Sequence, residues 1–173
     1  KFGFQLGAKY FNVLGINRLD MQVEYNTARP YTYTHFDSIG NYGHHSTPLA
    51  HPLGANFKET ILRIRYLPTI KWSASAYAMV YNYGDDATAN ANYGSNIFKS
   101  YNSRIADFGI KTLQGDQKKI IHLGGTFSYQ LFHNYFLDVN AYYRKDRSRP
   151  DDVTKYIGAG FRVNMWRKDL NLL

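Results

Sequence analysis

The chain has 173 residues, an aromatic content of 17% with 16 Tyr and 11 Phe, a net charge of +8 and a negative mean hydropathy. Cysteine is absent, which excludes disulfides and thiolate metal sites. Lys and Arg are spread along the chain rather than gathered in one run, which argues against nucleic acid as a partner. No apolar run approaches the roughly 18 residues of a membrane helix, so a helical span is excluded, whereas a span built from strands is not.

Seven segments alternate apolar and polar residues with the two-residue period of a β-strand. In the first segment Phe2, Leu6 and Tyr10 fall on one face, while Gln5 and Lys9 fall on the other. In chain order the segments span 2–10, 18–26, 58–66, 72–82, 120–132, 135–143 and 155–166. Because almost no helical period is present, the sequence predicts an all-β protein.

The predicted connections alternate between short and long. The short ones are 14–17, 67–71 and 133–134, and the longer ones are 27–57, 83–119 and 145–154. Outer-membrane barrels alternate short periplasmic turns with longer external loops. We therefore expect about 27–57 and 83–119 to be long external loops, and the C terminus to be periplasmic.

Strand length and face chemistry favour a membrane barrel over a soluble β-sandwich with an aromatic core. The segments approach the roughly 9 to 11 residues with which a tilted strand crosses a bilayer. Aromatic residues near segment ends on the apolar face suit the interfacial girdles of such a barrel: Phe2, Tyr10, Tyr25, Tyr66, Trp72, Tyr135 and Tyr143. The expected fold is an antiparallel transmembrane β-barrel of the outer-membrane type.

The strand number bears on the domain organisation. Seven is odd, whereas bacterial single-chain barrels have an even number of strands. We therefore expect residues 1–173 to form the C-terminal part, seven or so strands, of a single larger barrel. The sequence starts at Lys1 without the features of a signal peptide, so any export signal is expected to have been removed or to lie outside this chain.

The inner face of the predicted barrel is rich in glycine and charge. Basic residues including Lys9 face acidic ones, which predicts a hydrated or plugged lumen with structural ion pairs. The predicted charge network contains Arg18, Asp20, Glu24, Glu59, Arg63, Arg65, Asp138, Arg144 and Arg162.

Loop 27–57 is too long to be a mere connector, and long loops on a rigid scaffold often carry function. Its sequence predicts no secondary structure. Pro30, Pro48 and Pro52 restrict φ and favour a folded loop. Tyr, His, Asn and Arg stack on sugar faces or hydrogen-bond to hydroxyls. The ligand-binding candidates are Arg29, Tyr31, Tyr33, His35, Tyr42, His44, His51 and Asn56.

Two other readings of this loop are less favoured. His44, His45 and His51 as metal ligands lack a carboxylate at ligand spacing other than Asp37, so we expect no metal and no cofactor. Ser46 and Asp37 lie near histidines, but a catalytic triad is defined by geometry rather than composition. An outer-membrane lipid hydrolase is therefore the weakest alternative, and we expect no catalytic residue.

One part of the sequence resembles a known family. The residues are Glu24-Tyr25-Asn26, Arg29 to Tyr33, Asn41 to His44 and Pro48-Leu-Ala-His-Pro-Leu-Gly-Ala-Asn56. This stretch resembles the C-terminal barrel region of Bacteroidota outer-membrane proteins related to the capsule-assembly Wzi family, and the gliding-motility protein RemB looks like another relative. The resemblance implies a non-enzymatic role at the cell surface and assigns no binding residue.

Two functional classes follow from these expectations. The first is a barrel of the bacterial outer membrane that binds or anchors capsular polysaccharide or exopolysaccharide. The second is a structural subunit of a larger envelope complex for gliding motility, secretion or barrel assembly. Expected partners are outer-membrane lipid and lipopolysaccharide, with surface polysaccharide or other complex subunits. Loop charges at 99–119 and 144–149 would suit acidic glycolipids, or would simply be solvated.

Overall fold

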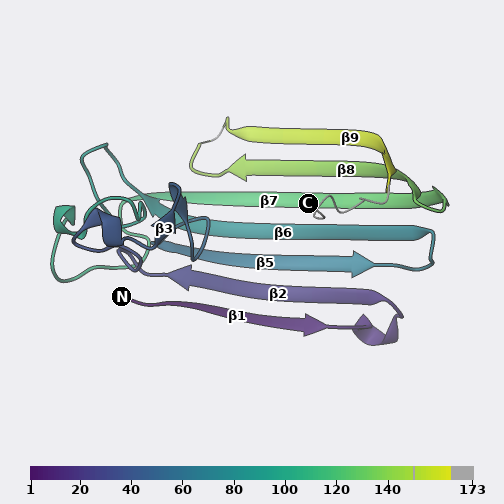
Figure 1. Ribbon diagram of the computed structural model, residues 1–173, viewed down its shortest axis with the longest axis horizontal. Coiled ribbons are helices and arrows are strands. Elements are labelled where there is room, and N and C mark those ends of the chain that lie inside the picture. Colours follow the sequence, from purple (N-terminus) through teal and green to yellow (C-terminus); the bar gives the residue numbers. More distant parts are fainter. Residues whose placement is uncertain (150, 165–173) are drawn as a thin grey trace, which may run out of the picture.

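The structure is a computed structural model that describes residues 1–149 and 151–164. Seven long strands form one antiparallel sheet in which each strand pairs with the next long strand along the chain (Figure 1). These strands are β1 (Gly3–Tyr10), β2 (Leu19–Ala28), β5 (Phe57–Tyr66), β6 (Trp72–Asp85), β7 (Asp116–Phe132), β8 (Tyr135–Asp146) and β9 (Val153–Val163). The predicted all-β class and antiparallel pairing are confirmed.

The sheet is open within the described part of the chain. Its strand order is β1-β2-β5-β6-β7-β8-β9, so β1 and β9 lie at the two edges and each has one neighbour. These seven strands therefore form no closed barrel, and their membership of a larger barrel, as expected from the sequence, stays a prediction.

Several strand limits differ from those predicted. β2 begins at Leu19, which leaves Arg18 in the preceding turn with φ at 61°. β6 and β7 are both longer than predicted at the long-loop end, because residues 83–85 pair with residues 116–118. Polar side chains at these ends give no alternating pattern, but the backbone can continue the ladder without one. The predicted strand residues 165–166 and the tail 167–173 lie outside the described residues.

The register keeps each face of the sheet uniform in character. One row across neighbouring strands runs through Ala8, Val23, Leu62, Ala78 and Leu123, all on the apolar face. The adjacent row on the other side of the sheet contains Glu24, Met79, His122 and Arg144. A slip of one residue would exchange the two faces, so the alternating sequence strongly specifies this register.

The long connections lie together at one end of the sheet and the short ones at the other (Figure 1). Loop 29–56 contains the 3-10 turn η2 (Ser38–Gly40) and a small hairpin of β3 (Gly43–His44) and β4 (Thr47–Pro48). The prediction of no secondary structure there was therefore wrong. Loop 86–115 contains η3 (Tyr101–Ser103), and η1 (Val13–Gly15) lies in the first short connection. Short elements of this kind lack a periodic sequence signal.

The buried core lies at the long-loop end and not between two layers of secondary structure. Ala28, Ala55, Phe57 and Ile97 form it, with Tyr33, Leu53 and Tyr83 packed around them. We call loops 29–56 and 86–115 together the loop layer. Within the described residues, no helix is long and apolar enough to cross a membrane.

Candidate functional site

The apolar face of the sheet has no protein layer over it in the described structure. Leu6 is 70% exposed, Val139 45% and Ile157 80%, although all three are apolar residues on strands. Exposed apolar patches larger than a few hundred Å² are rare on soluble monomers and mark interaction surfaces. This exposed apolar face spans all seven strands of the sheet. In water its exposure would be unfavourable, so the face is expected to contact another apolar surface.

Aromatic side chains on this face gather toward the short-turn end. The Trp72 ring lies 4.3 Å from the Tyr129 ring and 5.0 Å from the Phe127 ring, and the Tyr135 and Phe161 rings lie 5.9 Å apart. Each of six strands contributes an aromatic residue near this end: Tyr10, Tyr66, Trp72, Tyr129, Tyr135 and Phe161. Such a belt suits a boundary between lipid and water.

Asn56 joins the loop layer to the strands. It is fully buried, and its Nδ2 donates to the carbonyls of Gly84 at 2.9 Å and Gln114 at 2.8 Å. Its Oδ1 accepts from the Leu113 amide at 2.7 Å. Its φ of 59° lies in the left-handed region, which Asn tolerates better than most residues. The structure therefore gives this predicted ligand-binding candidate a structural position.

Tyr31 also lies inside the loop layer. It is 2% exposed, and its hydroxyl donates to the carbonyl of Asn92 at 2.5 Å. Its backbone amide donates to the carbonyl of Gly94 at 3.0 Å, and its ring meets that of Tyr101 edge-on at 5.8 Å. Burial raises the pKa of the Tyr31 phenol. Tyr31 thus connects the two long loops and is not open to a ligand.

Three further candidates hold the loop layer together. Arg29 Nη2 donates to the carbonyl of Ile110 at 2.6 Å, and Tyr33 packs against the loop core. His51 Nε2 lies 3.0 Å from Glu59 Oε2, and its ring stacks on Phe57 at 4.4 Å. The clustering of these residues in the sequence reflects the packing of a folded loop.

His35, Tyr42 and His44 are the three candidates that remain exposed. Tyr42 is 55% exposed, and its ring lies 6.1 Å from the Tyr33 ring. The His44 ring lies 4.1 Å from that of His45 at the tip of the small hairpin. These three side chains are the part of the predicted loop site that a ligand can reach.

The residues considered for catalysis or metal binding have other roles or stand apart. Asp37 accepts a hydrogen bond from the Ile39 amide at 3.0 Å and so caps the 3-10 turn. Across the described residues, no hydrogen bond joins the Ser46 hydroxyl to a histidine. In residues 1–149 and 151–164, no group of three or more His, Cys, Asp or Glu side chains is placed to hold a metal ion.

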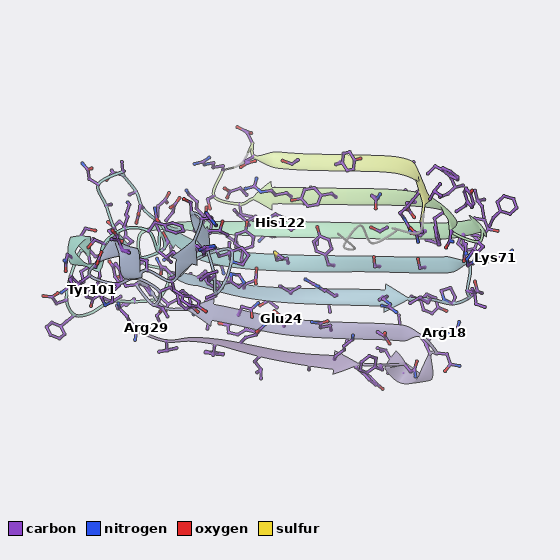
Figure 2. All side chains as sticks on the ribbon, viewed as in Figure 1. Arg18, Glu24, Arg29, Lys71, Tyr101 and His122 are labelled. Atoms are coloured by element: carbon purple, nitrogen blue, oxygen red, sulfur yellow. The ribbon has the colours of Figure 1, made fainter. Side chains whose placement is uncertain are left out.

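The polar face carries a hydrogen-bonded chain that leads into the loop layer. Gln5 Nε2 donates to Glu24 Oε1 at 2.6 Å, and Asn26 Nδ2 donates to Glu24 and to Glu59, each at 2.9 Å. Glu59 is 3% exposed and meets His51 at the loop end of the chain. Figure 2 shows the position of Glu24 on β2. These carboxylates are thus engaged in structural contacts.

A second polar cluster on this face was not predicted. His122 lies between two tyrosines, with Nδ1 2.8 Å from the Tyr142 hydroxyl and Nε2 3.3 Å from the Tyr81 hydroxyl (Figure 2). The three residues come from β8, β7 and β6. In the alternating pattern all three residues fall on the polar face. Tyrosines on that face do not contribute to the apolar face, so their position could have indicated a polar cluster.

The predicted charge network is only partly assembled. Arg162 pairs with Asp138, with Nε 2.6 Å from Oδ2, while Arg144 pairs with Asp152, which was not in the predicted set. In the described part of the chain, Arg63 and Arg65 make no ion pair.

A groove of about 520 Å³ opens on the polar face, lined mainly by polar-face side chains of β1, β2, β5 and β6. Its lining includes Lys9, Asp20, Gln22, Arg63, Arg65 and Tyr77. Arg18, labelled in Figure 2, lies in the short turn before β2, two residues from the lining residue Asp20, and is not itself part of the lining. The groove has the size of a small-molecule site and lies on the β1 side of the polar face, reaching toward the short-turn end.

Comparison with known proteins adds no relative: no family model matches the chain, and no curated protein and no solved structure shows significant similarity to it.

Proposed function

We propose that the seven strands cross the bacterial outer membrane as part of a β-barrel. The apolar face would contact lipid chains, the polar face would line the lumen, and the aromatic belt would lie at the periplasmic boundary. The carrying observation is the exposed apolar face, uniform across seven strands in one register. Lipid chains bury such a face without a second protein layer.

The open edges support a barrel larger than these seven strands. A strand edge inside a bilayer leaves backbone N–H and C=O groups without partners, at a cost of several kcal/mol for each group. β1 and β9 therefore need neighbours, and an even total requires an odd number of additional strands. We infer that residues 1–173 form part of that barrel. In this proposal the loop layer is external and the C terminus is periplasmic, and the grouping of the long loops at one end supports that orientation.

The proposed role is non-enzymatic binding or anchoring of capsular polysaccharide or exopolysaccharide. The loop layer supports it, because its buried contacts hold the exposed His35, Tyr42 and His44 on a fixed framework. Preorganised side chains lose less entropy on binding than mobile ones. The resemblance of residues 24–56 to Wzi-related barrels supports the same role.

The test uses the full-length protein purified in detergent and surface polysaccharide from the same cells. We expect binding to fall about tenfold or more in a triple variant carrying His35→Ala, Tyr42→Ala and His44→Ala, because these side chains form the accessible part of the loop site. Lys71→Ala is the matched control, since Lys71 lies at the short-turn end (Figure 2). Unchanged binding in the triple variant would contradict a loop site, and no binding by the wild type would contradict the role itself.

A second candidate is a structural subunit of a larger envelope complex. The loop layer exposes large apolar side chains, with Phe36 at 64%, Ile39 at 91% and Phe108 at 90%. Exposed apolar groups on an ordered surface suit a protein partner. Cross-linking in native membranes tests this role: Ile39→Ser with Phe108→Ser should release a cross-linked partner that the wild type retains.

A further inference from the structure

The groove on the polar face has more positive than negative charge. Lys9, Arg63 and Arg65 line it, and Asp20 is the one Asp or Glu among the described lining residues. Glu24 and Glu59 are the nearest carboxylates along the same strands, but both are already hydrogen-bonded. Glu24 accepts from Gln5 and Asn26, and Glu59 accepts from Asn26 and lies next to His51. The guanidinium groups of Arg63 and Arg65 make no ion pair in the described structure, whereas the Lys9 ammonium lies 4.8 Å from the centre of the Phe11 ring.

Lys9 and Arg63 belong to one row across the sheet. Lys9 is opposite Gln22, Gln22 is opposite Arg63, and Arg63 is opposite Tyr77. Side chains in such a row point from the same face and lie about 5 Å apart from strand to strand. The row thus sets two cations, an amide and a phenol side by side.

Tyr77 is the last residue of this row, and its ring lies flat against the sheet. Its partner across the ladder is Gly124, and a Cβ atom at that position would lie 2.4 Å from Tyr77 Cε1 and 2.5 Å from Cζ. The ring therefore lies across the glycine, along the surface of the sheet. Tyr77 remains 37% exposed and belongs to the groove lining, so part of its side chain is accessible there.

We propose that this groove binds an acidic saccharide, with a sugar ring on Tyr77 and its carboxylate between Arg63 and Arg65. Guanidinium groups bind carboxylates through paired charge-assisted hydrogen bonds, and an aromatic ring presents an apolar face with a polar edge. Gln22 and Ser75 supply hydrogen-bonding groups for sugar hydroxyls. This inference rests on the proposed polysaccharide role and moves its charge-recognition site from the loops to the lumen face.

The experiment measures binding to the full-length purified protein by calorimetry. The two probes are galacturonate oligomers and neutral glucose oligomers of equal length. The double variant Arg63→Gln with Arg65→Gln should weaken galacturonate binding at least about tenfold, because the charge-assisted hydrogen bonds to the carboxylate are lost. The glucose oligomer should bind more weakly than galacturonate to the wild type and equally to both proteins.

Matched variants separate charge from position. Lys71→Gln with Arg149→Gln removes the same charge at positions outside the groove lining and should leave galacturonate binding unchanged (Figure 2 labels Lys71). Arg63→Lys with Arg65→Lys keeps the charge but loses the paired geometry, so binding should be intermediate. Tyr77→Leu should weaken both saccharides, while Tyr77→Phe should retain the binding of each.

The outcomes distinguish this inference from the proposed function. Galacturonate binding that is equal in the wild type and in the Arg63/Arg65 glutamine variant overturns the groove site. If native polysaccharide still binds and is lost only in the His35/Tyr42/His44 triple variant, the surface role stands without the groove. If the wild type binds neither native polysaccharide nor either oligomer, the proposed function fails together with the inference.

Discussion

The sheet and the loop layer of this protein differ in whether other parts of the protein cover their apolar residues. At the long-loop end Ala55 and Ile97 of the loop layer pack against the strand ends Ala28 and Phe57, and Asn56 satisfies backbone groups around them. On the sheet, apolar side chains from seven strands remain exposed, and Leu6 and Ile157 are at least 70% exposed. The loop layer thus buries apolar residues against the ends of β2 and β5, whereas the apolar face of the sheet has no such covering in the described structure.

This difference explains how a rigid loop layer can sit on a single sheet. The strands provide a register fixed by alternation, and the loops supply the packing that strands in a second layer would otherwise provide. Each substitution below perturbs one region, so its effect on stability tests whether the loop layer and the sheet unfold independently.

The largest effect is expected for Asn56→Ala. The change leaves the Leu113 amide and the carbonyls of Gly84 and Gln114 without their partner, and it places Ala at a positive φ. We expect a loss of about 4 kcal/mol or more in the stability of the loop layer. Limited proteolysis should show faster cleavage of loop 86–115, while far-UV circular dichroism of the strands is retained. Asn56→Gly, which relieves only the backbone strain, should recover about 1 kcal/mol.

The next effect concerns the sheet. Val139 lies at the middle of β8 on the apolar face, so Val139→Lys should destabilise the protein in phospholipid vesicles by about 2 to 4 kcal/mol. Asn140→Lys places the same charge on the opposite face and is the control. Denaturant unfolding from vesicles measures both variants. Equal, small effects would mean that the apolar face is not in lipid.

A smaller effect is expected at the junction between the two regions. His51→Ala removes a partner of the buried Glu59 carboxylate and the ring that stacks on Phe57. We expect a loss of about 2 kcal/mol in the thermal stability of the protein in detergent. His44→Ala, on the exposed hairpin, should change stability by less than about 0.5 kcal/mol. The prediction fails if both histidines are equally dispensable.

The smallest effect is the pH dependence contributed by Tyr31. Because burial raises the pKa of the Tyr31 phenol above its ordinary value of 10.0, the folded state binds the proton more tightly than the unfolded state. The stabilisation is therefore fully present below pH 10 and is lost as the pH rises through the folded pKa. Tyr31→Phe should cost about 1 kcal/mol at neutral pH through the lost bond to Asn92, and its stability should fall less steeply above pH 10. Parallel slopes for the two proteins would contradict this account.

Alternation predicted the sheet well because its period is a local property of the sequence. The seven strands, their antiparallel order and the two faces follow from it, as the row from Ala8 to Leu123 illustrates. Strand ends were less predictable, because residues 83–85 and 116–118 continue the ladder through backbone bonds that leave no side-chain pattern. Arg18 was placed in a strand because the pattern does not report its positive φ.

The loop site was harder to predict because composition does not distinguish packing from binding. Tyr31 and Asn56 have side chains suited to sugars, yet both are buried and bonded to backbone groups 58 or 61 residues away in the sequence. The cluster of Tyr81, His122 and Tyr142 was missed for the related reason that its members come from three strands. Only the register brings them together.

The account rests on the placement of the apolar face in lipid, and the lack of native cysteine allows a direct test. Single cysteines are introduced at Leu62, Arg63, Val139 and Asn140 of the full-length protein in outer-membrane vesicles, labelled with a fluorophore and exposed to brominated lipids or to aqueous quencher. We predict quenching by lipid at positions 62 and 139 and by aqueous quencher at positions 63 and 140. Equal access of the aqueous quencher to all four positions would contradict a strand-built membrane span.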